Sequence, residues 1–225
     1  MRLLAISDIH GHADALGAIL AAADRVGYDR LLVAGDLCFP GPEPLAVWRR
    51  LKQAGAVIVQ GVSDRAVAAI DPELIRPKSP EEAERRERLR FVRAELGAGI
   101  LAELAALPTS ARLPLPDGGE LLLVHGSPAD PLEPMSHEMT DDELRALLGD
   151  DPADVIVCGG SHLPFDRDVM GVRIVNVGSV GESCAPGFAN AVVIDVSGTK
   201  LDALPLNVPL GAVDAFAARP DAPTS

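Results

Sequence analysis

The chain has 225 residues, of which 48% are hydrophobic but only 3% aromatic, and its net charge is -13 at pH 7. This length predicts one domain over residues 1–206, followed by an Ala- and Pro-rich tail over 207–225. The negative charge argues against a nucleic-acid partner, because nonspecific binding needs Lys and Arg to displace counterions. A small phosphorylated substrate remains compatible with it, since a bound dication reverses the local potential.

Cysteine usage and hydropathy point to a soluble chain. Cys38, Cys158 and Cys184 are scattered without a CxxC spacing, so they do not form a disulfide framework. No apolar run reaches the roughly 18 residues that a membrane span needs. We therefore expect a cytoplasmic protein with no membrane partner. Many soluble proteins form symmetric dimers, and the sequence leaves a homodimer open.

The first third of the chain alternates between predicted strands and helices. Short apolar runs at 3–6, 31–34 and 57–59 predict buried strands. Between them, the spacing of apolar residues predicts helices over Ala13–Val26 and from Pro42 to Lys52. This order predicts parallel strand pairing with helical crossovers.

A charge-dense helix is predicted over Glu81–Leu96, within a helical embellishment at 66–112 that lies over or beside the site. It could be a basic lid that clamps a substrate phosphate, or a solvated face with Glu–Arg pairs. Charge runs are usually solvated, so the pattern favours the second interpretation. The arginines in question are Arg85, Arg86, Arg88, Arg90 and Arg93.

The later part of the chain is rich in predicted strands. A hairpin is expected from residues 112–115 and 120–124, and a capping box at Thr140 opens a helix through Leu148. Further strands are predicted at 155–158, 172–177, 189–196 and 201–206. The fold class is therefore α/β, with an α+β character.

Carboxylates and imidazoles follow five of these apolar runs. Asp8 and His10 follow the first run, Asp36 the second and Asp64 the third, while His125 and His162 follow two later runs. Ligands in α/β sheets gather at the carboxyl ends of strands. Asp and His side chains suit manganese, iron or zinc, and calcium much less. We expect alternate residues Asp8 and His10 to point to the same side and reach one divalent metal.

The motifs resemble those of the calcineurin-like metallophosphoesterases. The resemblance covers most of residues 1–196 and is close to a bacterial subgroup related to dinucleoside-polyphosphatase-like and small phosphodiesterase enzymes. It implies a double β-sandwich flanked by helices, with two metals among the loop ends. The matching segments are Ser7–Gly11, Gly35–Asp36, Val124–Pro128, Ser161–Phe165 and the closing loop Asn176–Gly181.

Three positions depart from the family pattern. Val62 and Gly160 stand where the family carries an Asn and a His that bind the second metal, and Ser63 replaces the motif histidine. By this resemblance the first metal keeps the ligands Asp8, His10, Asp36 and His162, whereas the second keeps only Asp36 and His125. This implies a one-metal protein or a rebuilt second site. Conceivable replacements are Asp64, Ser127, Cys158, Cys184 and Glu182.

Two functions remain open on this basis. The first is a metal-dependent phosphoesterase that hydrolyses a small phosphomonoester or phosphodiester with metal-activated water; one metal and a reduced activity are both compatible with it. We expect its catalysis to depend on Asp36, His125, Asp64 and His12. His12 could act as general acid in place of Ser63, or be a solvent-exposed residue at a helix start. The second function is that of a metal- or ligand-binding protein that has lost catalysis.

Overall fold

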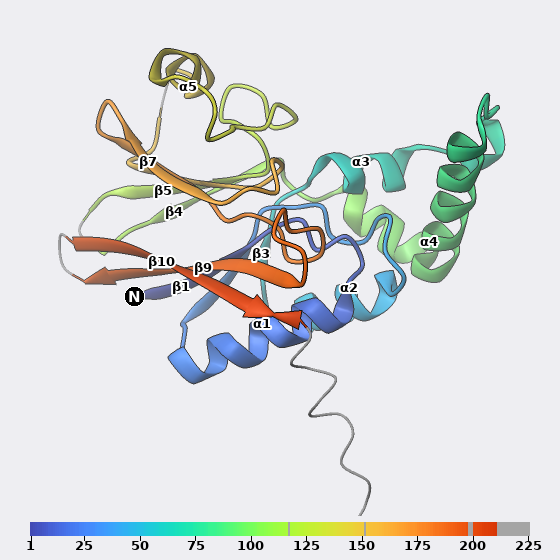
Figure 1. Ribbon diagram of the computed structural model, residues 1–225, viewed down its shortest axis with the longest axis horizontal. Helices are drawn as coiled ribbons and strands as arrows, with labels where there is room; N and C mark the ends of the chain where they lie inside the picture. Colours follow the sequence, from blue (N-terminus) through green and yellow to red (C-terminus); the bar gives the residue numbers. More distant parts are fainter. Residues whose placement is uncertain (117, 151, 198–199, 211–225) are drawn as a thin grey trace, which may run out of the picture.

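Two five-stranded mixed sheets pack face to face between layers of helices (Figure 1). The computed structural model describes residues 1–116, 118–150, 152–197 and 200–210. The first sheet has the strand order β10-β9-β1-β2-β3 and the second the order β4-β5-β6-β8-β7. This arrangement confirms the predicted α/β fold, a double β-sandwich flanked by helices.

The first sheet has a parallel half and an antiparallel half. β1 (Arg2–Ile6), β2 (Arg30–Val33) and β3 (Val57–Ile58) are parallel, as predicted. The crossovers α1 (Ala13–Val26) and α2 (Pro44–Gln53) also lie where the sequence predicts helices. On the other side of β1, the sheet continues with two long antiparallel strands, β9 (Phe188–Ser197) and β10 (Lys200–Pro209).

β10 corrects the predicted start of the tail. The strand continues past Leu206 to Pro209, so residues 207–209 belong to the sheet. The side-chain amide of Asn190 donates to Asn207 Oδ1 at 2.8 Å, which helps to hold this end in register. The rest of the predicted tail, from residue 211, lies outside the described residues.

The second sheet contains one strand that the sequence did not predict. β4 (Ser110–Pro114), β5 (Glu120–Val124), β6 (Val155–Cys158) and β8 (Val172–Asn176) agree with prediction to within a few residues. The unpredicted strand, β7 (Phe165–Val169), lies at the sheet edge and pairs only with β8. Because its residues are largely charged, it lacks the apolar run that predicts a buried strand.

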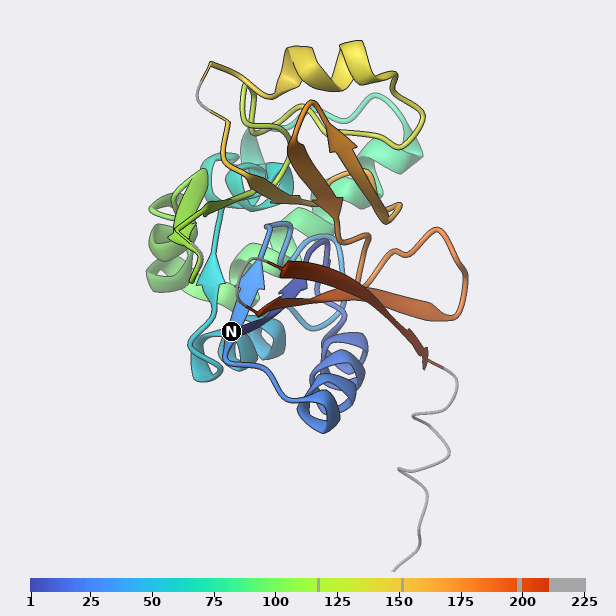
Figure 2. The same ribbon diagram turned by 90° about the vertical axis from the view of Figure 1, so that its left-hand side faces the viewer.

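Alternation along the strands builds three apolar layers. Leu3 and Ala5 of β1 point into the core between the sheets, whereas Leu4 and Ile6 point outward to the layer of α1 and α2. On the second sheet, the outward layer packs against α5 (Asp141–Leu147). Figure 2 shows this stack edge on, with α5 above one sheet and α1 below the other.

A helical segment lies at one end of the sandwich (Figure 1). It comprises α3 (Val62–Ala69), the short 3-10 helix η1 (Pro72–Leu74) and α4 (Pro80–Ala105). α3 starts at Val62, and α4 continues past the expected Leu96 through a kink at Gly97. The helices in the described part of the chain are all too short or too polar to cross a bilayer.

Candidate metal centre

The backbone after β1 and β2 takes an uncommon conformation at the predicted ligands. Asp8, His10 and Asp36 have φ values of 54°, 50° and 56°, and His162 in the loop after β6 has 59°. Positive φ is uncommon for residues other than glycine, and such strain gathers at functional sites. Asp8 and His10 therefore lie in a turn beyond Ile6. Their convergence comes from this turn, which corrects the expectation that strand alternation would orient them.

Backbone hydrogen bonds join the first two loops. The amides of Asp8 and His10 each donate at 3.0 Å, to the carbonyls of Gly35 and Asp36. Gly61 also approaches these loops very closely: a Cβ at this position would lie only 2.2 Å from Asp36 Oδ1. The carboxylate of Asp36 is thus held in a narrow gap between loops.

Three histidines are oriented by backbone carbonyls. Nδ1 of His10 lies 2.5 Å from the carbonyl oxygen of Phe39, and Nδ1 of His125 lies 2.6 Å from that of Ala34. Nδ1 of His162 lies 3.1 Å from the carbonyl oxygen of Glu182. These contacts place the proton on Nδ1 in the neutral ring and leave the Nε2 lone pair for a metal.

The first cluster of donor atoms forms around His10. His10 Nε2 lies 3.1 Å from His162 Nε2, 3.7 Å from Asp8 Oδ1 and 4.0 Å from Asp36 Oδ2. Asp8 Oδ1 lies 3.1 Å from His162 Nε2, but with the proton of His162 on Nδ1 both atoms are acceptors, so no donor satisfies this buried carboxylate oxygen. Leaving such an oxygen unsatisfied costs about 1–3 kcal/mol. A divalent cation between these atoms would satisfy Asp8, so the residues fit a metal.

The second cluster is poorer in donors. Asp8, Asp36 and His125 bring ligand atoms within 4.8 Å of one another, with His125 Nε2 3.7 Å from Asp36 Oδ1. Val62 lines the same cavity as Asp36, and Gly160 lies against His125, but neither offers a side-chain donor. A Cβ on Gly160 would lie 3.2 Å from Pro134 Cβ and 3.5 Å from His125 Nε2, so a side chain at this position would start beside this histidine.

Asp64 holds the backbone on which Asp36 lies. Its buried carboxylate accepts hydrogen bonds from the amides of Asp36 at 2.8 Å, Leu37 at 2.9 Å and Gly61 at 2.9 Å. Burial and the nearby charge of Asp36 raise the pKa of Asp64 to about 6. Both oxygens face backbone amides, so Asp64 has the contacts of a positioning residue.

The charges of the first cluster favour a bound cation, whether a proton or a metal. Burial lowers the pKa of His10, but the neighbouring Asp8, the Phe39 carbonyl and further carboxylates outweigh it and raise that pKa to about 9. Burial raises the pKa of Asp8, but His10 and His162 outweigh it and leave that pKa below its usual value. A metal therefore competes with a proton at His10.

A cavity of about 930 Å³ adjoins the first cluster. His10, Asp36 and Glu182 line one part of it, and His12 at the start of α1 lines it too. His12 is thus within the cavity, where a substrate could meet it. His137, another histidine that could act as an acid, is exposed and does not line this cavity.

The arginines of α4 divide between the cavity and the solvent. Arg86 and Arg90 form ion pairs with Glu87, as expected for a solvated face, and Arg93 donates to the carbonyl of Val67. Arg85 and Arg88 instead line the cavity. The solvated face is therefore observed for Arg86 and Arg90, whereas a phosphate clamp by Arg85 and Arg88 stays a prediction.

The conceivable replacement ligands lie in different places. Cys158 is buried in β6, where burial raises its pKa, and Ser127 hydrogen-bonds within its own loop to Asp130. Cys184 is exposed and lines a different hollow. Glu182 lies at the first cluster rather than the second, 3.8 Å from His10 Nε2. The sequence gives no signal for this placement, because it depends on how distant loops pack.

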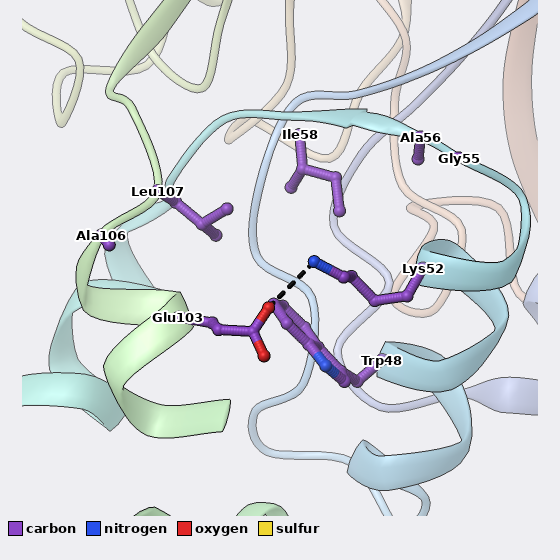
Figure 3. Close-up of a pocket in the computed structure, with 8 residues that line it drawn as sticks. All are labelled: Trp48, Lys52, Gly55, Ala56, Ile58, Glu103, Ala106 and Leu107. Atoms are coloured by element: carbon purple, nitrogen blue, oxygen red, sulfur yellow. Dashed lines mark hydrogen bonds and ion pairs between the residues drawn. The ribbon is translucent and has the colours of Figure 1, made fainter. Parts of the chain in front are cut away.

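A second cavity, of about 500 Å³, contains none of the candidate ligands (Figure 3). Lys52 lies across it, 2.9 Å from Glu103 and 5.3 Å from the centre of the Trp48 ring. The ion pair and the ring contact explain the positions of these side chains without a ligand.

Comparison with known proteins agrees with this geometry. Residues 1–199 match the sequence profile of the calcineurin-like phosphoesterase superfamily domain. The chain belongs to this family. Family members use divalent metals, and the two donor clusters are candidate sites for them. No curated protein sequence matches the chain significantly.

Solved structures show the same fold at low sequence identity. A hypothetical protein from Pyrococcus horikoshii OT3 superposes with a TM-score of 0.77 at 18% identity, over 96% of this chain and 91% of that one. A metallophosphoesterase from Sphaerobacter thermophilus gives 0.72 at 22% identity, over 98% and 95%. The phosphoesterase Yfce from E. coli gives 0.53 at 20% identity, over 93% and 100%.

Proposed function

We propose that this chain is a metal-dependent phosphoesterase that hydrolyses a small phosphomonoester or phosphodiester. The observation that carries the proposal is the convergence of Asp8, His10, Asp36 and His162 around a buried carboxylate oxygen that lacks a hydrogen-bond partner. The family membership supports the same reaction class.

Each residue has a role that follows from its contacts. A bound divalent metal, which we expect to be manganese, iron or zinc, supplies polarisation of a phosphoryl oxygen and a lowered pKa of water. Asp8, His10, Asp36 and His162 hold that ion. His125 holds a second ion or the phosphate itself, and its fixed Nδ1 contact keeps Nε2 directed at Asp36.

A residue that lines the cavity must protonate the leaving group. Ser63 cannot donate a proton as an imidazolium can, and its backbone amide already donates to Asp36 Oδ1 at 2.8 Å. His12 lines the cavity, and its side chain makes no capping hydrogen bond to α1. We assign it the role of general acid, a contribution typically worth about 10²–10⁴-fold.

The cavity suits a small substrate. Its volume of about 930 Å³ lies within the range of roughly 300–1,000 Å³ for small-molecule sites. Phe39, Pro40 and Val62 offer apolar contacts, and Arg85 and Arg88 offer positive charge to an anion from a wall that also carries the α4 carboxylates Glu81, Glu82 and Glu84. A homodimer and the absence of nucleic-acid and membrane partners remain predictions.

The alternative function is that of a binding protein without catalysis. Val62, Ser63 and Gly160 favour it, because they remove donors of the second cluster and the motif histidine. The intact first cluster favours the enzyme, since a site without function has no need to keep an unsatisfied buried carboxylate.

Replacement of a ligand distinguishes the two functions. We expect Asp36→Asn to abolish hydrolysis of bis(p-nitrophenyl) phosphate and p-nitrophenyl phosphate by the manganese-loaded protein. Asp24→Asn, an exposed change on α1, serves as the matched control and should retain full activity. Hydrolysis that survives Asp36→Asn, or is absent from the wild type, would contradict the enzyme and leave the binding function.

A further inference from the structure

The loop after β8 is joined closely to the loop that carries Asp8. The hydroxyl of Ser179 donates to the Asp8 carbonyl at 2.8 Å, and the amide of Gly181 donates to the same carbonyl at 3.0 Å. Ser179 Oγ also accepts from the amide of Glu182 at 2.7 Å. A Cβ on Gly181 would lie 2.2 Å from the Ile9 carbonyl oxygen, so only glycine permits this approach. The backbone of Glu182 is therefore fixed relative to Asp8.

This backbone directs the carboxylate of Glu182 at the first cluster. Glu182 Oε2 lies 3.8 Å from His10 Nε2 and 3.9 Å from Nδ1 of His162. Asp8 and Asp36 approach the same His10 nitrogen at 3.7 Å and 4.0 Å. Glu182 is thus as close to His10 Nε2 as the two carboxylates that the family resemblance assigns to the metal.

The separation of 3.8 Å between Glu182 Oε2 and His10 Nε2 suits two donors of one ion. Two donors bound to the same metal at about 2.0–2.2 Å lie roughly 3–4 Å apart. Glu182 is also tied to a second donor through its backbone, because its carbonyl oxygen lies 3.1 Å from Nδ1 of His162. The same residue therefore orients one imidazole and offers a carboxylate beside the other.

We propose that Glu182 is a direct ligand of the metal at the first site, in addition to Asp8, His10, Asp36 and His162. The inference rests on the proposed function only in that the first cluster binds a divalent metal. Three carboxylates and two imidazoles then surround one ion, a donor set that suits manganese or iron. The chain has lost two donors at the second site and gained one at the first, which favours occupancy by a single ion.

Metal affinity tests the proposal independently of activity. The full chain is stripped with chelator and titrated with Mn²⁺, with free Mn²⁺ followed by electron paramagnetic resonance, for wild type, Glu182→Gln and Glu84→Gln. Glu84 lines the same cavity from α4 and is the matched control. We expect Glu182→Gln to weaken binding at least about tenfold and Glu84→Gln to leave it unchanged. The visible spectrum of the Co²⁺ form should change in the first variant alone.

The outcomes separate this inference from the proposed function. Equal Mn²⁺ affinity and an equal Co²⁺ spectrum for wild type and Glu182→Gln would overturn the role of Glu182 and leave the phosphoesterase proposal standing. A wild-type chain that binds no Mn²⁺ would overturn both. The Glu182 side chain is 40% exposed, so the variant should fold, and Glu182→Ser read in the same way provides a second variant if it does not.

Discussion

Single residues at this site are prepared for metal binding by contacts that do not involve a metal. The backbone carbonyls at Nδ1 fix the rings of His10, His125 and His162, so that each Nε2 faces a carboxylate. This arrangement avoids the entropic cost of ordering three side chains when an ion binds. The tautomer is set by the fold rather than by the ion.

Proton release is the first prediction at this scale. Burial lowers the pKa of His10, but Asp8 and the other neighbours raise it to about 9 in the metal-free protein, so the ring is charged at pH 7.5. A ligand nitrogen must lose its proton before it binds a metal. We expect Mn²⁺ binding at pH 7.5 to release about one proton, and the affinity to rise with pH up to about 9.

Calorimetry in two buffers with different ionisation enthalpies measures this release. Equal binding enthalpies in both buffers would mean that no proton leaves and would contradict a His10 ring that is charged at pH 7.5 before the metal binds. Asp8→Asn serves as the control because it removes both a ligand and the first carboxylate partner of His10.

Asp64 gives the second prediction, which belongs to the junction of two elements. Its carboxylate joins the loop after β2 to the start of α3 through three backbone amides. Asparagine keeps one acceptor oxygen, and a buried amide left unpaired costs about 1–3 kcal/mol. We expect Asp64→Asn to lose that much unfolding free energy in urea and to bind Mn²⁺ more weakly. Asp71→Asn, at the exposed cap of η1, is the control, and equal stability of the two variants would refute the role.

The loops at Val62 and Gly160 give the third prediction. We expect Val62→Asn combined with Gly160→His to raise the manganese content from about one ion per chain to two, because the first change adds a donor to the wall that holds Asp36 and the second adds one beside His125. The histidine must take the φ of +75° found at Gly160, at a cost of about 1–2 kcal/mol. Elemental analysis measures the content. A content that matches the Val62→Ala and Gly160→Ala control would argue against a simple loss of donors.

The sequence was informative about elements whose residues are buried. Apolar runs predict β5 and β6 to the residue, because both faces of these strands contact apolar layers. β7 escaped prediction because an edge strand needs fewer apolar residues. The sequence placed Asp8, His10 and Asp36 at strand ends, but their left-handed backbone and the contact of Glu182 arise from packing between distant loops.

At the scale of the whole molecule, the two sheets and their loops form one unit around the site, so metal binding should stabilise the fold. A ligand that binds only the folded state adds about 2.7 kcal/mol at a concentration of 100 times its Kd. We expect Mn²⁺ at that excess to raise the melting temperature of the wild type. Asp8→Asn should show no such rise, and an equal rise in both proteins would mean that Mn²⁺ acts elsewhere.

The most direct test of the central claim is to measure metal content and hydrolysis on the same preparation. The chain is purified without chelator, refilled with manganese to graded occupancies, and assayed on bis(p-nitrophenyl) phosphate at each occupancy. We predict about one tightly bound ion per chain and a rate that rises in proportion to occupancy. A chain that retains no metal, or hydrolysis that does not depend on occupancy, would contradict the assignment of a metal-dependent phosphoesterase.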